Sequence, residues 1–350
     1  MPTHRDLTNL DILRSFAVLL VATGHFTMYE QIARYNGWIG LTGVCLFFVH
    51  TCLVLMWSLE RDPHTGRFYI RRAFRLFPLW LVVLAVVVIV HLPTSPVPPV
   101  NGVLFLYHSP SFGELLANIT LTANIWYGSN IVGASWSLPI EMQMYLFLPL
   151  LFFFIRSTHA LWVLLVLDVV VIASVWAVVG IHNTPHATLA ICVPYFLPGV
   201  MAYALYKRVQ PRLPAWTFLM FLLVMAAIHM RGGNLFRSAF WCLGIGLALP
   251  FFRQITWRPL AHAAHLVARY SYGIYLCHIP SIWVGMTVLR GHSIFLQLAL
   301  ALATLIAASV GLYHLVEAPM IRLGGKIATK IEPGPGPRMN EATLSLEPAP

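Results

Sequence analysis

The first long apolar stretch, Leu10–Phe26, reads LDILRSFAVLLVATGHF and carries Asp11, Arg14 and His25 in a segment otherwise suited to a lipid bilayer. Charged groups inside a membrane helix are costly, so they are usually retained for a task. On an α-helix, Arg14 and His25 lie within about 20° of one direction and about 16 Å apart along the axis. Asp11 falls on the same side. The stretch therefore predicts a membrane helix with one polar face.

The composition extends this interpretation to the whole chain. Hydrophobic residues make up 59% of the 350 residues and charged residues 10%, with a mean hydropathy of +0.76, whereas soluble proteins have about 25% charged residues. We expect an all-α, polytopic helical bundle of about ten transmembrane helices in the cell (inner or plasma) membrane. The predicted spans are residues 10–29, 38–59, 76–92, 134–155, 160–180, 187–206, 214–230, 235–252, 271–289 and 294–316.

The basic residues indicate membrane topology. The formal net charge of +10 would suit a nucleic-acid partner, but lysine and arginine lie in short connections between apolar runs, so no nucleic acid is expected. Alternate connections are rich in them, and the positive-inside rule then predicts that both termini are cytoplasmic. We expect a membrane domain over residues 1–323 and a cytoplasmic, proline-rich, disordered tail over residues 324–350.

Two further expectations concern cysteines and the longest loop. The five cysteines lie in apolar segments without metal-binding spacing, so they are interpreted as buried packing thiols and no metal site is predicted. Residues 93–133 form a long connection with aromatic and apolar content. Such loops are usually functional or disordered, and this one could hold re-entrant or interfacial helices that line a site open to the outside.

A carboxylate is expected at the depth of His25. Glu141 lies in SWSLPIEMQMYLFLPLL, about 8 Å into its span when counted from Trp136. A pair between Glu141 and His25 would orient the imidazole and strengthen it as a base. The alternative is a structural salt link or a cap on the span.

The segment RFYIRRAFRLFPLW carries Arg71, Arg72 and Arg75 at the predicted cytoplasmic start of the third span. These residues could simply anchor the topology. They could also form a phosphate clamp, because planar guanidinium groups bind phosphates through two hydrogen bonds. A phosphorylated cytoplasmic donor such as coenzyme A would suit that position.

Two C-terminal segments add polar groups. RYSYGIYLCHIP presents Tyr275 and His278 at helical spacing, and LYHLVEAPMIRL places Glu317 before Pro319, which is expected to end the helix. Glu317 could cap the helix or pair with basic residues. Asp168 is an isolated intramembrane acid with no assigned role.

Taken in order, these motifs resemble the acyltransferase-3 family of integral membrane O-acyltransferases over residues 10 to about 323. The resemblance implies about ten spans and transfer of an acyl group, commonly acetyl, to a hydroxyl of a carbohydrate or related acceptor. It also implies that Arg14 and His25 are an essential pair and that Trp136, Ser137 and Glu141 form the motif of the fourth span. The three arginines before the third span would match the family's basic motif.

The chain departs from the family pattern at three points. FFVHTCLVL places His50, Thr51 and Cys52 where the family often has Phe-Phe-x-x-Ser-Gly-Phe, which could bear on acceptor choice. Met142 follows Glu141 where a second acid is frequent. Some family members carry a soluble esterase-like domain after the last span. This sequence shows none, so we expect any such extracytoplasmic transferase partner to be a separate protein.

The resulting hypothesis is a membrane O-acyltransferase without a bound cofactor. Acyl-CoA, with acetyl-CoA favoured, would approach from the cytoplasm with its phosphates on Arg14 and the arginine cluster. His25 would act as general base on a carbohydrate or glycolipid acceptor, and Glu141 would orient it. Membrane lipid is the remaining partner. The predicted supporting residues are Asp11, Trp136, Ser137, Tyr275, His278 and Glu317.

Two other classes of membrane protein share part of this pattern. A proton-coupled transporter of a sugar-linked or lipid substrate also uses intramembrane Arg, His and Glu, but many transporters show repeats or paired broken helices, which this sequence lacks. A non-catalytic membrane scaffold is disfavoured by the matched depths of His25 and Glu141.

Overall fold

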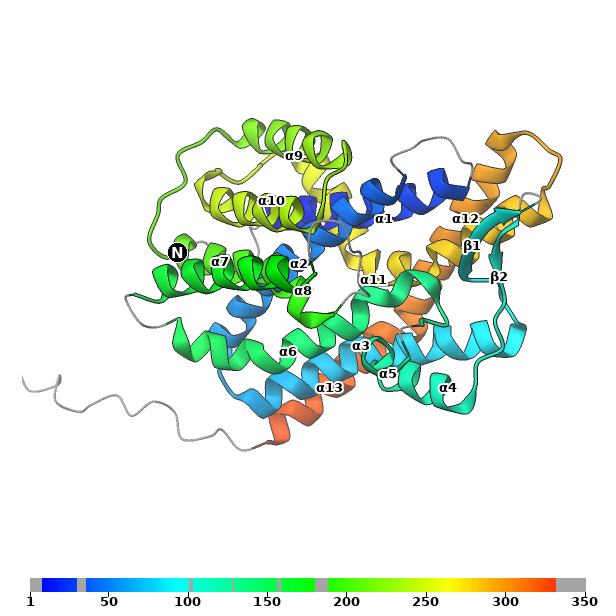
Figure 1. Ribbon diagram of the computed structural model, residues 1–350, viewed down its shortest axis with the longest axis horizontal. Coiled ribbons are helices and arrows are strands. Elements are labelled where there is room, and N and C mark those ends of the chain that lie inside the picture. The colour runs from blue at the N-terminus through cyan, green and yellow to red at the C-terminus, as the bar shows by residue number, and fades with distance from the viewer. Residues whose placement is uncertain are drawn as a thin grey trace, which may run out of the picture.

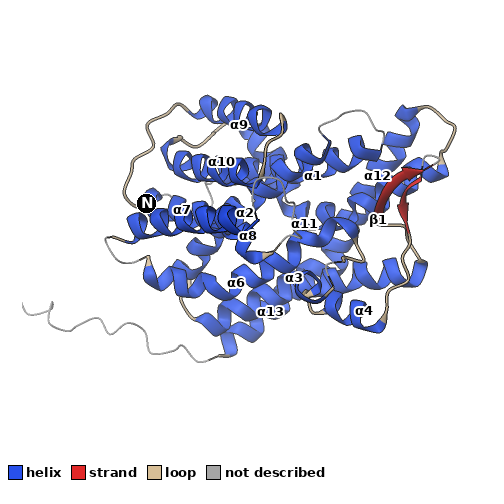
Figure 2. Cartoon of the chain, in the orientation of Figure 1, coloured by secondary structure: helices blue, strands red, loops and turns tan. Residues whose placement is uncertain are grey.

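The computed structural model describes residues 8–29, 36–100, 103–127, 129–155, 159–179 and 188–331. The predicted helical class is confirmed, and each predicted span overlaps a helix, although the helices of the third and ninth spans begin earlier, at Thr65 and Arg258 (Figures 1 and 2). These helices are α1 (Thr8–Tyr29), α2 (Asn36–Arg61), α3 (Thr65–Val90), α6 (Ser137–Phe154), α7 (Ala160–Val179), α8 (Leu189–Tyr206), α9 (Ala215–Met230), α10 (Leu235–Ala248), α11 (Arg258–Val288) and α12 (Ile294–Leu312).

The membrane character is also supported, although the count of ten spans stays a prediction. Seven helical segments of the described chain are long and apolar enough to cross a bilayer. Two further apolar segments, Ala215–Met230 and Phe236–Phe251, are shorter. The cytoplasmic placement of both termini likewise stays a prediction.

The long connection between α3 and α6 is partly helical. It contains α4 (Phe112–Ile119), α5 (Ala123–Trp126) and the short 3-10 helix η1 (Gly133–Trp136). It also forms a two-stranded antiparallel hairpin, β1 (Ser95–Val100) and β2 (Val103–Leu106), which the sequence analysis did not predict and which Figure 2 shows in red.

Asn118 fixes this connection against the bundle. Its side-chain oxygen accepts from the backbone N–H of Ile131 at 3.1 Å, and the indole N–H of Trp80 on α3 donates to its backbone carbonyl at 2.9 Å. The connection therefore lies against α3 and delivers η1 to the start of α6.

Helix α2 is the centre of the bundle and packs against α1, α8, α6 and α10. Glycine permits two of these contacts. A Cβ at Gly43 would collide with the backbone carbonyl of Ala17 on α1, and one at Gly199 on α8 would collide with that of Val49 on α2. Small residues let membrane helices approach closely, so the polar face of α1 lies directly against α2.

The predicted helix stop at Glu317 is wrong. Helix α12 passes through a π-helical turn, η3 (Tyr313–Glu317), and continues as α13 (Ala318–Lys330), which packs against α3. A π turn accommodates Pro319 because it changes the local hydrogen-bond register. Residues 324–330 of the expected disordered tail are therefore helical, and residues 332–350 lie outside the described residues.

Asp168 lies on α7, far from the other acids in sequence. It is fully buried, and neither of its carboxylate oxygens has a hydrogen-bond partner among the described residues. Helix α7 packs against α8 and α10. Burying this carboxyl group without an observed hydrogen-bond partner costs folding free energy.

We predict that Gly43→Ala lowers the midpoint of thermal unfolding in detergent, because overpacking a tight contact costs about 1–3 kcal/mol. The matched control is Gly37→Ala on the same helix, where an added Cβ would meet nothing within 4 Å. An unchanged midpoint for Gly43→Ala would contradict the close approach of α1 and α2.

We also predict that Asp168→Leu raises the unfolding midpoint, because it removes a buried acid that lacks an observed partner. Asp168→Asn is the control, and it should raise the midpoint less because an unpartnered amide remains buried. A lower midpoint for Asp168→Leu would show that the carboxyl group has a partner.

Candidate functional site

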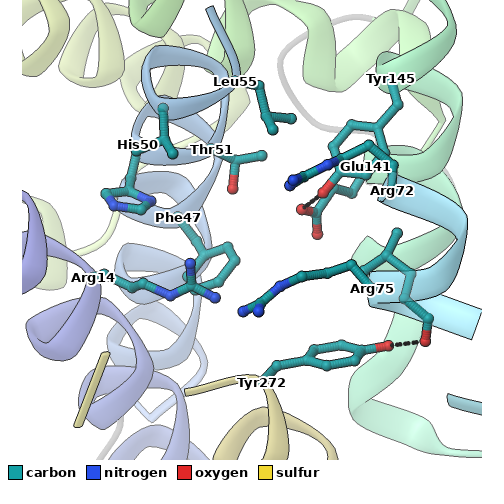
Figure 3. A pocket seen from close by; sticks show the side chains of 12 residues that line it. Arg14, Phe47, His50, Thr51, Leu55, Arg72, Arg75, Glu141, Tyr145 and Tyr272 are labelled. Carbon is teal, nitrogen blue, oxygen red and sulfur yellow. Dashed lines mark hydrogen bonds between the residues drawn. The ribbon is translucent and has the colours of Figure 1, made fainter. Parts of the chain in front are cut away.

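Three guanidinium groups converge in a cavity of about 50 Å³ within the bundle (Figure 3). Arg14 comes from α1, whereas Arg72 and Arg75 come from α3. Arg14 reaches into this space from one side, and Arg72 and Arg75 lie opposite it, on the same side as Glu141 and Tyr145 of α6 (Figure 3). The lining residues are Arg14, Phe47, His50, Thr51, Val54, Leu55, Arg72, Arg75, Leu76, Glu141, Tyr145 and Tyr272.

Each arginine is held differently. Arg14 donates from Nε to Ser271 Oγ at 2.6 Å, and its guanidinium lies 5.3 Å from the centre of the Phe47 ring. Arg75 forms an ion pair with the fully buried Glu317 at 3.1 Å. The Nε of Arg72 has no hydrogen-bond partner among the described residues. Arg72 therefore has the fewest observed side-chain partners of the three arginines.

The cluster carries an excess of positive charge. Three guanidinium groups, those of Arg14, Arg72 and Arg75, face two carboxylates, Glu141 and Glu317. If all are ionised, one positive charge is uncompensated. Planar guanidinium groups in a confined space are suited to binding an anion such as a phosphate.

The expected pair between Glu141 and His25 is wrong. Glu141 accepts a short hydrogen bond from the Tyr145 hydroxyl, four residues further along α6. The side-chain partner of His25 is instead His278. Glu141 lines the arginine cavity instead, because a depth counted along the chain does not define which way a side chain points.

The predicted arginine clamp also needs correction. Arg71 pairs with Asp62 at 2.7 Å and does not line the arginine cavity. Around α3, Arg72 lies about 60° from Arg75 on one side, and Arg71 lies about 40° from Arg75 on the other. Spacing alone could not decide between Arg71 and Arg72, because residues three and four apart both share a helix face.

Two further cavities adjoin the arginine cavity, and the three together follow the polar face of α1. A wide cavity of about 480 Å³ shares Arg14, His50 and Arg75 with it and reaches Asp11. A narrow one of about 20 Å³ shares Phe47, Glu141 and Tyr272 with it. The narrow cavity continues to Val21, Ser137 and Tyr275.

The two histidines lie one helical turn beyond the narrow cavity. His25 follows Val21 on α1 by four residues, and His278 follows Tyr275 on α11 by three. His25 Nδ1 lies 3.0 Å from the Val21 carbonyl oxygen and 3.2 Å from His278 Nε2. The row of cavities therefore runs from Asp11, through the arginines, toward the histidine pair.

The other predicted supporting residues take different positions. Ser137 and Tyr275 line the narrow cavity and share a hydrogen bond at 2.9 Å. Asp11 lines the wide cavity and contacts His265 at 3.0 Å. Trp136 packs edge-on against the Phe48 ring and lines none of the three cavities described above.

Four polar residues of the arginine cavity were not among the predicted site residues: His50, Thr51, Tyr145 and Tyr272. His50 is buried, and its Nδ1 has no partner among the described residues. His50 and Thr51 belong to the segment that departs from the family pattern, which was a signal that they matter. Tyr145 was detectable as the residue four positions after Glu141, at hydrogen-bonding distance on a helix.

No group of three or more metal-ligating side chains was found in the part of the chain that the structure describes. All five cysteines, Cys45, Cys52, Cys192, Cys242 and Cys277, are buried free thiols, as expected.

The chain is similar to several named proteins, some of which are named as acyltransferases. It is 25% identical to a Bacillus subtilis protein named as a candidate peptidoglycan O-acetyltransferase, over 91% of this chain and 55% of that protein. It is 29% identical to nodulation protein 10 of Rhizobium leguminosarum, over 42% and 44% of the two chains. The chain thus spans about half the length of these two relatives.

A third relative matches almost end to end. An acyltransferase of Streptomyces mycarofaciens is 26% identical over 96% of this chain and 97% of its own. No solved structure matches the chain. The sequence profile of the acyltransferase-3 family, described as an acyltransferase domain, matches residues 7–314. The chain therefore belongs to the acyltransferase-3 family.

Proposed function

We propose that this protein is a multi-pass membrane O-acyltransferase that moves an acyl group, with acetyl favoured, from acyl-CoA to a hydroxyl of a carbohydrate or glycolipid. The observation that carries the proposal is the row of adjoining cavities along α1, which starts at Asp11, passes three guanidinium groups and stops one helical turn short of a histidine pair. A phosphorylated donor with a distant reactive thioester matches that arrangement.

The donor phosphates would lie among Arg14, Arg72 and Arg75. The excess of positive charge favours an anion there, and Arg72 has an Nε without an observed partner. The wide cavity at Asp11 would admit the donor from the cytoplasm, because Asp11 lies at the end of the first span that is predicted to face the cytoplasm.

The thioester arm would extend through the narrow cavity toward His25. That cavity and the arginine cavity measure about 20 and 50 Å³, so an arm can pass only if lining side chains rotate. Phe47 and Tyr272 line both cavities, and reorienting these two rings would join them. Binding of the donor is therefore expected to move Phe47 and Tyr272.

In the chemical step, His25 Nε2 takes the proton of the acceptor hydroxyl as its oxygen attacks the thioester carbonyl. The new O–C bond forms, the C–S bond breaks, and the thiolate of coenzyme A recovers the proton from His25. No serine nucleophile is required because a thioester is already activated.

The acceptor class is suggested by the relatives. One of them is named for peptidoglycan O-acetylation, which favours a carbohydrate hydroxyl on the far side of the membrane from the donor.

We predict that His25→Ala lowers kcat by about 10²–10⁴, because it removes the general base. The measurement uses purified protein in nanodiscs with radiolabelled acetyl-CoA and candidate glycans. Unfolding midpoints of the variant and the wild type must agree. Undiminished transfer by His25→Ala would overturn the mechanism, and substrate transport without acyl transfer would favour the transporter.

We predict that Arg72→Gln raises the KM for acyl-CoA about tenfold, the effect of losing about 1.4 kcal/mol of binding. The matched control is Arg71→Gln, one residue away, which breaks an ion pair with Asp62 outside the cavity. Equal KM values for the two variants would contradict the assignment of Arg72, rather than Arg71, to the donor site.

A further inference from the structure

Both ring nitrogens of His278 on α11 contact neighbouring groups. It is 1% exposed. Its Nδ1 lies 2.6 Å from the backbone carbonyl oxygen of Tyr275, and its Nε2 lies 3.2 Å from His25 Nδ1. The two imidazole rings are 4.9 Å apart at their centres and tilted by 57°.

These contacts define where the protons lie. A carbonyl oxygen only accepts, so His278 Nδ1 must carry the hydrogen that reaches Tyr275. A neutral imidazole has one N–H, which leaves Nε2 of His278 as an acceptor. The atom that faces it, His25 Nδ1, must then be the donor.

A second contact imposes the same tautomer on His25. The Val21 carbonyl lies 3.0 Å from His25 Nδ1 and also only accepts. His25 Nδ1 therefore carries its hydrogen between two acceptors, Val21 and His278. The remaining nitrogen of His25, Nε2, keeps its lone pair, which a general base requires.

We propose that His278 is the positioning residue of His25: it holds the imidazole in the tautomer and orientation that leave Nε2 free, and it accepts from Nδ1–H when His25 becomes an imidazolium. The proposal rests on the proposed acyl transfer. Across the step His278 stays neutral, since the hydroxyl proton goes to His25 Nε2 and leaves with the thiol of coenzyme A.

A neutral partner suits this location. In many enzymes a carboxylate orients the base, but an ionised carboxylate is expensive to bury in a membrane unless it is paired. Glu141, the carboxylate expected for this role, contacts Tyr145 instead. A histidine supplies an acceptor without placing a permanent charge beside His25.

The test compares His278→Leu with His278→Gln. The leucine variant removes the acceptor and should lower kcat at least about tenfold while the KM for acyl-CoA stays unchanged, because the arginine cavity is untouched. The glutamine variant places an amide oxygen near the former Nε2 and should recover part of that loss. Asparagine is too short to replace Nε2.

The matched control is His229→Leu, which removes another buried histidine whose two ring nitrogens are both bonded, to Thr42 at 2.7 Å and to Ser238 at 2.9 Å. It should lower the yield of folded protein but leave kcat per folded molecule unchanged. A wild-type kcat for His278→Leu, or equal losses for the leucine and glutamine variants, would overturn the proposal.

A readout without substrate separates this proposal from the proposed function. Solid-state NMR of protein labelled with ¹⁵N only in histidine should show His25 protonated at Nδ1 and a correlation between the two imidazoles that disappears in His278→Gln. If this correlation is present but no acyl transfer is detected, the proposed function fails and the pair stands. If transfer occurs and His25 is protonated at Nε2, the positioning role is overturned.

Discussion

The structure depends on neutralising three guanidinium groups inside an apolar bundle. Arg14, Arg72 and Arg75 would each be very costly in a bilayer if left alone. Glu317 forms an ion pair with Arg75, Glu141 lines the same cavity, and Ser271 accepts a hydrogen bond from Arg14. The charges come from α1, α3, α6 and the π-helical turn η3, so one cluster joins segments far apart in the sequence. Removing one partner would leave the others buried and unpaired.

The π-helical turn between α12 and α13 places one of those counter-charges. It ends at Glu317, whose side chain is fully buried against Arg75 on α3. Helix α13 then continues along α3, with Gly324 in close contact with Phe74. The turn thus lets a single continuous helix both deliver a carboxylate inward and pack over the outside of α3. π turns are frequent at functional sites for this kind of reason.

The helices were predictable from the sequence because apolar runs of membrane length have few other structures available. The site was predictable in part. Arg14 and His25 were identified because they interrupt the first run, and the arginine triplet because guanidinium groups suit a phosphate and the segment matches the family's basic motif. The partners were not predictable: which of Arg71 and Arg72 faces inward, and whether Glu141 meets His25 or the arginines, depends on helix rotation. The rotation of each helix about its axis is set by packing contacts such as that at Gly43, and the spacing of residues in the sequence does not reveal these contacts.

The position of Glu141 among the arginines, rather than beside His25, explains why charged and neutral groups lie at different places along α1. Had Glu141 paired with His25, the arginines would have kept a larger unbalanced charge, and the base would have carried a permanent ion pair in an apolar environment. With Glu141 among the arginines, formal charge concentrates where an anion would bind. The histidine end is then built from neutral groups, with His278, the Tyr275 carbonyl and the Val21 carbonyl all in reach. In the proposed mechanism, charge arises there only while His25 holds the transferred proton, so the cost of burial falls on a short-lived state.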